Sequence, residues 1–231
     1  MTHPIVQIIV TLIASLGLLI PGIQATTEPD YELMSHAQFM AADVDTQVTV
    51  ETYVQATQSW WNDTINVYAQ SPDGGYFIYE MSCTEEQAAQ LTPGTKIRVT
   101  GDKALWSGLP EIMNATFEFV DEERFVAIPM DMNGRLGTSA MEQQMNKKVH
   151  FSGMTVEAIA FKNGAPGDDI YLTLSQNGLT CEFCVEVYLT GPETEVYRTV
   201  CDLEVGDTVD VTAMLYWYEG PNPHILEILA Y

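Results

Sequence analysis

The segment LTPGTKIRVT at residues 91–100 recurs as LEVGDTVDVT at residues 203–212. In each copy a glycine turn leads into a run in which apolar and polar residues alternate, a pattern typical of a half-buried β-strand. A strand that recurs together with its turn, within a chain of 231 residues, indicates that a whole structural unit occurs twice.

The elements before this strand recur in the same order. The strand-like run VTVETYVQA (48–56) corresponds to VHFSGMTVEA (149–158), and INVYAQ (65–70) corresponds to IYLTLS (170–175). In each copy, turn residues and a further strand follow the second run, as in a β-hairpin. Each copy therefore begins with three strands.

Short helices complete the pattern. The sequence T-E-E-Q beginning at Thr84 predicts a capped helix after the first hairpin, and Pro192 suits the first position of its counterpart. S-x-x-E/Q patterns beginning at Ser35 and Ser139 predict another short helix before each copy. In both copies the fourth strand is followed by a turn and a fifth strand.

Strand, strand, strand, helix, strand, strand is the element order of the OB-fold, a five-stranded barrel. We therefore expect an all-β protein with short helices and two tandem five-stranded OB-fold barrels, at residues 48–120 and 149–231. A lead-in segment (26–47) and a connector (121–148), each with a short helix, complete this division. A single ten-stranded sandwich is the alternative, because both classes contain short, evenly spaced strands.

Several strings also carry a resemblance. VTVETYVQATQSWW, GGYFIYEM, LTPGTKIRVTG and VYRTVCDLEVGDTVDV, together with LYWYEGPNPHI, are similar to an uncharacterised family of secreted tandem OB-fold proteins from anaerobic gut-type bacteria. The match extends over nearly the whole chain after the N-terminal apolar run. It implies the fold and secretion, and it brings no catalytic residues.

The N-terminal segment points to export. Residues 5–20 are mostly apolar, and Pro21 and Gly22 end the run. The run is shorter than the about 20 residues of a membrane span. Ala25 offers a small residue before a polar stretch, as at a signal cleavage site. We expect a signal peptide at residues 1–25, with a retained N-terminal anchor as the alternative, and a protein that is secreted or on the extracytoplasmic surface.

The composition is that of a globular protein with a strong negative charge. Hydrophobic residues make up 46%, enough for a sizeable core. Nine Lys and Arg residues stand against 32 Asp and Glu residues, which gives a formal net charge of -23. Such a field repels phosphate backbones and anionic membranes, so a nucleic-acid partner is not expected. Saccharides, peptides and other proteins remain as partners.

All four tryptophans fall in loops at the rims of the expected barrels. An OB barrel usually binds through this rim and through the face of its second and third strands. Flat rings there can stack on a ligand, and they can equally close the barrel end or pack the two barrels together. The predicted ligand-binding residues are Trp60, Trp61, Trp106, Trp217, Tyr216 and Tyr218.

We expect a non-catalytic binding module whose ligand is a carbohydrate, a peptide or a cell-surface partner. Binding of single-stranded nucleic acid or of a nucleotide is the first alternative, by analogy with a common use of the fold. An extracellular hydrolase, or an accessory protein of one, is the second.

No catalytic residue, metal site or cofactor is expected. The histidines have no neighbouring Cys or His ligands, and neither a G-x-S-x-G elbow nor a glycine-rich phosphate loop occurs. Cys181 and Cys184 are three residues apart on a predicted strand, so they point to opposite faces, about 10 Å from each other, and cannot bridge. A disulfide between Cys184 and Cys201 is expected, with Cys181 to Cys201 as the alternative.

Overall fold

The computed structural model of the chain describes residues 32–231. The signal peptide predicted at residues 1–25 lies outside the described residues. Within the described part, no helix combines the length and the apolar character that a membrane span requires.

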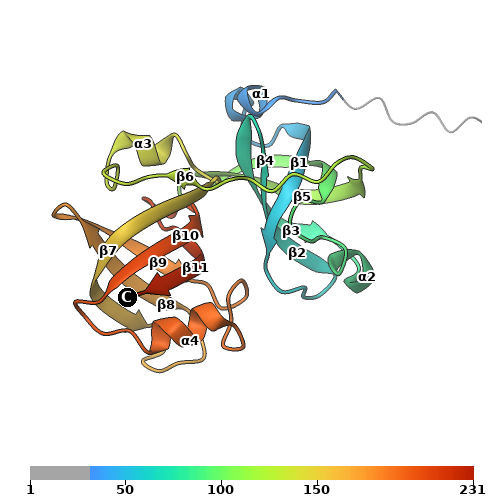
Figure 1. Cartoon of the computed structure of the whole chain (residues 1–231). Helices are drawn as coiled ribbons and strands as arrows, with labels where there is room; N and C mark the ends of the chain where they lie inside the picture. Colours follow the sequence, from blue (N-terminus) through green and yellow to red (C-terminus); the bar gives the residue numbers. More distant parts are fainter. Residues whose placement is uncertain (1–31) are drawn as a thin grey trace, which may run out of the picture. The chain divides into compact units, whose positions relative to one another are not determined.

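The first barrel is a closed sheet of five strands (Figure 1). The order around the barrel is β1-β2-β3-β5-β4, and β4 closes on β1. The pairs are antiparallel except for β3 and β5, which are parallel. The strands are β1 (Gln47–Thr57), β2 (Thr64–Ser71), β3 (Gly74–Ser82), β4 (Lys96–Trp106) and β5 (Leu109–Phe119).

The second barrel repeats this arrangement. Its order is β7-β8-β9-β11-β10, with β10 pairing back to β7 and with β9 and β11 parallel. The two-residue strand β6 (Met130–Asp131) of the connector adds to β7 in parallel. The expected fold, two tandem five-stranded OB-fold barrels with short helices, is confirmed, and a single ten-stranded sandwich is excluded. The strands are β7 (Lys148–Phe161), β8 (Ile170–Gln176), β9 (Leu179–Val185), β10 (Thr208–Met214) and β11 (His224–Ala230).

Four short helices occur in residues 32–231. Figure 1 shows α1 and α2 at opposite ends of the first barrel, and α3 and α4 at opposite ends of the second. As expected for this fold, α2 and α4 each connect the third strand of a barrel to the fourth. The helices are α1 (His36–Ala41), α2 (Glu85–Ala88), α3 (Ser139–Glu142) and α4 (Glu195–Cys201).

The capping signals in the sequence predicted two helix starts correctly and placed the other two at the wrong residue. Both capping boxes predicted in the first half of the chain are present. In the second half, α3 is capped by Thr138 instead of Ser139, and α4 is capped by Thr194, so that Pro192 precedes the helix. In both cases a threonine hydroxyl in an extended residue satisfies a free N–H group of the first turn, which is a strong start signal.

Each barrel encloses its own hydrophobic core. Along β2 the side chains of Ile65, Val67 and Ala69 belong to the core of the first barrel, as period-two alternation requires. Tyr68 points to the outer face, yet only 1% of it is exposed. A strand that is buried on both faces must be covered from outside by another layer.

A buried cation holds α1 on the first barrel. The ammonium group of Lys103 on β4 donates hydrogen bonds to the carbonyl oxygens of Met40 (2.8 Å) and Ala42 (2.6 Å) at the end of α1. Lys103 is 6% exposed, and its Nζ lies 5.4 Å from the centre of the Phe39 ring. Burial lowers the pKa of Lys103. The two carbonyl groups compensate for the hydration that its charge has lost.

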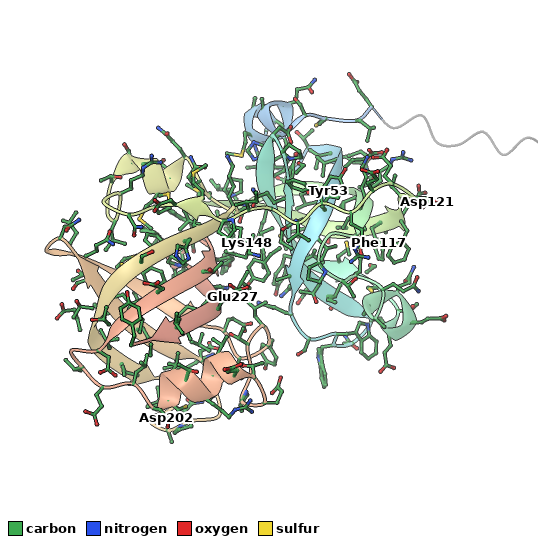
Figure 2. All side chains as sticks on the ribbon, viewed as in Figure 1. Tyr53, Phe117, Asp121, Lys148, Asp202 and Glu227 are labelled. Atoms are coloured by element: carbon green, nitrogen blue, oxygen red, sulfur yellow. The ribbon has the colours of Figure 1, made fainter. Side chains whose placement is uncertain are left out.

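Replacing Lys103 with methionine keeps the apolar stem and removes the hydrogen-bond donors. We expect the free energy of unfolding to fall by about 1–2 kcal/mol, because the carbonyl groups at the end of α1 lose their partner. Urea denaturation measures the change. Lys148→Met at the start of β7 (Figure 2) is the matched control, because the Lys148 side chain makes no hydrogen bond within the described residues. An equal loss in both variants would contradict the role of Lys103.

Candidate functional site

The outer face of β2 and β3 is covered by the second barrel. Tyr68 and Phe77 from these strands cluster with Leu109 and with Met214 of the second barrel, and all four are at most 3% exposed. The ring centres of Tyr68 and Phe77 lie 5.0 Å apart. The strand face through which an OB barrel usually binds is therefore occupied in the first barrel, and a ligand has to use the rim.

A chain of hydrogen bonds crosses this contact. The amide of Asn66 donates to Oε1 of Gln58 (2.6 Å), and Nε2 of Gln58 donates to the Tyr68 hydroxyl (3.1 Å). That hydroxyl lies 2.6 Å from Nδ1 of His224 in the second barrel. With Gln58 as donor to the hydroxyl, the hydroxyl proton is directed to Nδ1, and the ring proton of His224 sits on Nε2. Burial lowers the pKa of His224 to about 3, so the ring is neutral at pH 7.

The loop between β1 and β2 ends in a tight turn. Trp61 and Thr64 exchange two backbone hydrogen bonds of 3.0 Å, and Asn62 and Asp63 between them have φ values of 49° and 59°. Two positive φ angles are the mark of a type I′ turn, which Asn and Asp tolerate better than most residues. The turn fixes the direction of the residues before it, Trp60 and Trp61.

The two adjacent tryptophans have different surroundings. Trp60 packs against the core of the first barrel, and its Nε1 donates a hydrogen bond to the carbonyl oxygen of Cys83 (2.7 Å). Trp61 is 79% exposed. Consecutive residues of an extended chain point to opposite sides, so one ring stabilises the barrel and the other offers a free aromatic face.

Trp61 borders a pocket of about 380 Å³, which we call the rim pocket. Tyr188 of the second barrel forms one of its walls. The carbonyl oxygen of Tyr188 accepts hydrogen bonds from the backbone nitrogen (2.7 Å) and the hydroxyl (3.2 Å) of Ser59, which keeps this wall in place. The residues that characterise the rim pocket are Gln58, Trp60, Trp61, Asn66, Glu80 and Tyr188.

The rim pocket is lined by one carboxylate, that of Glu80, and by no cation. The cations of the first barrel are engaged elsewhere. Lys96 and Arg98 pair with Glu51 at 2.7 and 2.8 Å, and Lys103 holds α1. The pocket therefore presents aromatic faces and amide groups, without the positive charge that holds phosphates.

The remaining tryptophans lie at the β4–β5 and β10–β11 turns and do not line the rim pocket. Trp106 is 56% exposed. Trp217 packs into the cluster between the barrels, and a Cβ atom added at Gly108 would lie 3.1 Å from its Nε1. Gly108 also has a φ of 91°, which L-residues rarely adopt, so this close approach requires glycine.

A second pocket of about 470 Å³ lies beside β8 and β9 of the second barrel, and we call it the acidic pocket. Tyr216 and Tyr218 from the β10–β11 loop line it. The ring of Tyr216 stacks on His224 with the centres 4.3 Å apart, and it meets Phe77 of the first barrel edge-on at 5.1 Å. The polar residues that characterise this pocket are Asp169, Glu182, Cys184, Glu186 and His224.

The six predicted contact residues are thus divided. Two of them, Trp60 and Trp61, meet at the rim pocket, and Tyr216 and Tyr218 meet at the acidic pocket. The other two, Trp106 and Trp217, line neither. Their assignment to ligand binding stays a prediction from the sequence, because position in a loop does not determine where a ring points.

The expected disulfide is absent: the structure describes all four cysteines, and each is a free thiol. Cys184 lines the acidic pocket, whereas Cys201 packs against the core inside the second barrel, so the barrel wall separates the predicted pair. Cys181 also lies in that core and is unbridged. Burial raises the pKa of Cys181 to about 12, which keeps its thiol protonated and unreactive near neutral pH.

No family model matches the chain, and neither does a curated protein. Solved structures do resemble it. An asparaginyl-tRNA synthetase from Pyrococcus horikoshii complexed with asparaginyl-adenylate is 18% identical, with a TM-score of 0.30, over 36% of this chain and 19% of that one. A murine DNA-binding protein bound to double-stranded DNA is 11% identical, with a TM-score of 0.39, over 79% of this chain and 96% of that one. A replication protein A heterotrimer bound to single-stranded DNA is 11% identical, with a TM-score of 0.36, over 80% and 48%.

These neighbours correct two expectations drawn from the sequence. The three structures named above are described as complexes with DNA or with an adenylate, which goes against the expectation of a carbohydrate, peptide or cell-surface ligand. The same descriptions go against a second expectation, that nucleic acid is not a partner. It rested on net charge, which does not reveal what a single pocket can hold. At these identities and scores the likeness concerns the fold alone, so the ligand has to be argued from the pockets themselves.

Sequence reasoning missed the polar residues of both pockets. Gln58 and Asn66 flank the predicted β1–β2 loop, so pairing the two strands across that loop could have placed them side by side. His224 gave no signal, because its partner Tyr68 lies 156 residues away in the other repeat. Contacts between two repeats are not encoded in the pattern of either one.

Proposed function

We propose that the protein is a non-catalytic binding module whose rim pocket takes a nucleobase, presented by a nucleotide or by a short single strand of nucleic acid. The base stacks on the exposed ring of Trp61, and its polar edge meets the amides of Gln58 and Asn66. The single observation that supports this most strongly is the 79% exposed indole at the border of a pocket lined by amides.

The chemistry of the rim pocket suits a base. Gln58 and Asn66 each use one amide N–H group inside the protein, which leaves each of them a second donor for a ligand. A base combines a flat face with donors and acceptors along its edge. Stacking on an aromatic side chain contributes about 1–3 kcal/mol per base. The volume of about 380 Å³ lies in the range of small-molecule sites.

The negative charge of the protein favours contact with the base of a nucleotide over contact with its phosphate groups. With a net charge of -23 and no cation lining the pocket, phosphate groups are repelled rather than bound. We therefore expect a nucleoside to bind at least as tightly as its triphosphate. Affinity for an oligonucleotide should stay constant or rise with salt, because binding releases no counterions and salt screens the repulsion.

Replacing Trp61 with alanine tests this proposal. Calorimetric titration of the wild type with adenosine and with a short oligothymidylate should give saturable binding. Trp61→Ala should weaken it about 5- to 150-fold, the equivalent of about 1–3 kcal/mol. Trp106→Ala is the matched control, since it removes another exposed tryptophan of the same barrel that does not line the pocket. Its dissociation constants should equal those of the wild type.

The proposal fails if neither probe binds the wild type, or if the two tryptophan variants lose affinity equally. A steep decrease in oligonucleotide affinity with rising salt would also contradict it. That result would place binding on a cationic surface instead of in the rim pocket.

A further inference from the structure

The acidic pocket of the second barrel is lined by other residues than the proposed base site, and it carries unbalanced negative charge. Asp169, Glu182 and Glu186 line it. Lys162 pairs with Asp169 at 2.9 Å and so compensates for one of these charges. Glu182 and Glu186 form no ion pair within residues 32–231. With two carboxyl groups that no cation pairs in the described part of the chain, this site attracts positive ligands.

Two polar atoms at this pocket lack a hydrogen-bond partner among the described residues, and one of them is buried. Oε2 of Glu186 is buried and finds no hydrogen bond among the described residues. His224 is 6% exposed, and its Nδ1 meets Tyr68, but Nε2 has no hydrogen-bond partner in the part of the chain that the structure describes. Buried polar groups are nearly always satisfied, so the unpaired Oε2 of Glu186 points to a group that comes from outside the chain, and Nε2 of His224 is free to donate to such a group.

We propose that the acidic pocket binds a small organic ammonium ion that also carries a hydrogen-bond acceptor. The positive group lies near the carboxyl groups of Glu182 and Glu186. The ring of His224 is neutral, so it does not repel this positive group. The alkyl groups lie against Tyr216 and Tyr218, and the exposed ring of Tyr218 offers a face that attracts a cation. The acceptor, a hydroxyl or carbonyl oxygen, receives the N–H of His224 Nε2.

Binding is coupled to the ionisation of Glu186. Burial raises the pKa of its carboxyl to about 7. The charge of Asp169 adds to the effect, whereas hydrogen bonds from the backbone of Tyr188 and Leu189 and the charge of Lys162 oppose it. The other titratable groups that face Glu186 are Tyr68 on β2, Tyr216 in the β10–β11 loop and, lining the same pocket, Glu182, Cys184 and His224. The ammonium ion binds the ionised carboxylate. Affinity should therefore rise about tenfold from one pH unit below this pKa to one unit above it, with release of a proton.

Choline is a suitable probe, since it joins an ammonium group to a hydroxyl, and dimethylbutanol is its neutral carbon analogue. In calorimetric titrations of the full chain above pH 7, choline should bind at least tenfold more tightly than dimethylbutanol. Glu186→Gln should remove the pH dependence, and Glu182→Gln should weaken binding several-fold. Glu227→Gln removes an exposed carboxylate of β11 outside the pocket (Figure 2) and is the matched control.

Equal affinity for choline and its neutral analogue would overturn the proposal. So would an equal effect of Glu186→Gln and Glu227→Gln, because it would assign binding to the general negative field. Trp61→Ala should leave choline binding unchanged, so that the two pockets can succeed or fail separately. Glutamine matches the shape of glutamate, and the pH dependence of the wild type gives a readout that needs no variant.

Discussion

Replacing Tyr68 with alanine is expected to lower the free energy of unfolding by about 3–5 kcal/mol, the range for truncation of a buried aromatic residue. Tyr68 is 1% exposed although it points out of the first barrel. Its ring packs against Phe77, and its hydroxyl meets Gln58 and His224. The expected loss is this large only because the second barrel covers the outer face of β2.

Two further variants separate the sources of this loss in urea denaturation. Tyr68→Phe keeps the ring but leaves Gln58 and His224 without a partner, which should cost about 1–3 kcal/mol. Tyr231→Phe removes the hydroxyl of a 70% exposed ring and should stay within about 0.5 kcal/mol of the wild type. If Tyr68→Ala lost less than about 1 kcal/mol, far below the range for a buried ring, the barrels would not pack through this face in solution.

The contact between the barrels also supports both pockets. Asn66 and Gln58 line the rim pocket, and the hydrogen-bond chain that starts with them ends at His224, which lines the acidic pocket. Side chains that are held by such partners keep their orientation when a ligand arrives, which reduces the entropy lost on binding. The second barrel therefore completes the site of the first one.

The repeat in the sequence made the fold predictable. Strand alternation and hairpin turns act over a few residues and agreed in both copies, and the capping signals located each short helix to within a few residues. The turn at Asn177 and Gly178, with φ values of 54° and 78°, is an example, because only few residue pairs tolerate two positive φ angles. Where local signals agree in this way, the element order follows and with it the barrel.

The docking of the barrels was not predictable in this way, although one signal was present. Residues 67–69 of β2, Val-Tyr-Ala, are buried without a polar interruption, which indicates a strand covered on both faces. The pattern shows that a cover exists but not which surface provides it.

The orientation of the tryptophans was not predictable from the sequence either. Trp60 and Trp61 had to point to opposite sides, and only the register of the turn at Asn62 and Asp63 decides which ring faces the core.

Replacing Glu111 is the second change from which we expect a large effect on the free energy of unfolding. Glu111 lies on β5, is 3% exposed, and forms no hydrogen bond or ion pair within residues 32–231. Burial raises the pKa of its carboxyl to about 7. At higher pH the folded protein must bury a charge without a partner. We therefore expect Glu111→Gln to raise the free energy of unfolding by about 1–3 kcal/mol above pH 7, since each unit of pKa shift corresponds to about 1.4 kcal/mol and residual solvent contact reduces the total.

The pH dependence of this gain distinguishes it from a change in packing. Between the ordinary pKa of 4.5 and about 7, the folded protein holds a proton on Glu111 that the unfolded chain has released, so stability falls as the pH rises through this window. His224 acts in the opposite sense, because its pKa is lowered from 6.5 to about 3 and stability falls as the pH drops through that range. The difference between Glu111→Gln and the wild type cancels the contribution of His224. The stability gain of Glu111→Gln over the wild type should be smallest near pH 4.5, grow as the pH rises and level off above pH 7. A gain that is equal at every pH would show that burial does not raise the pKa of Glu111.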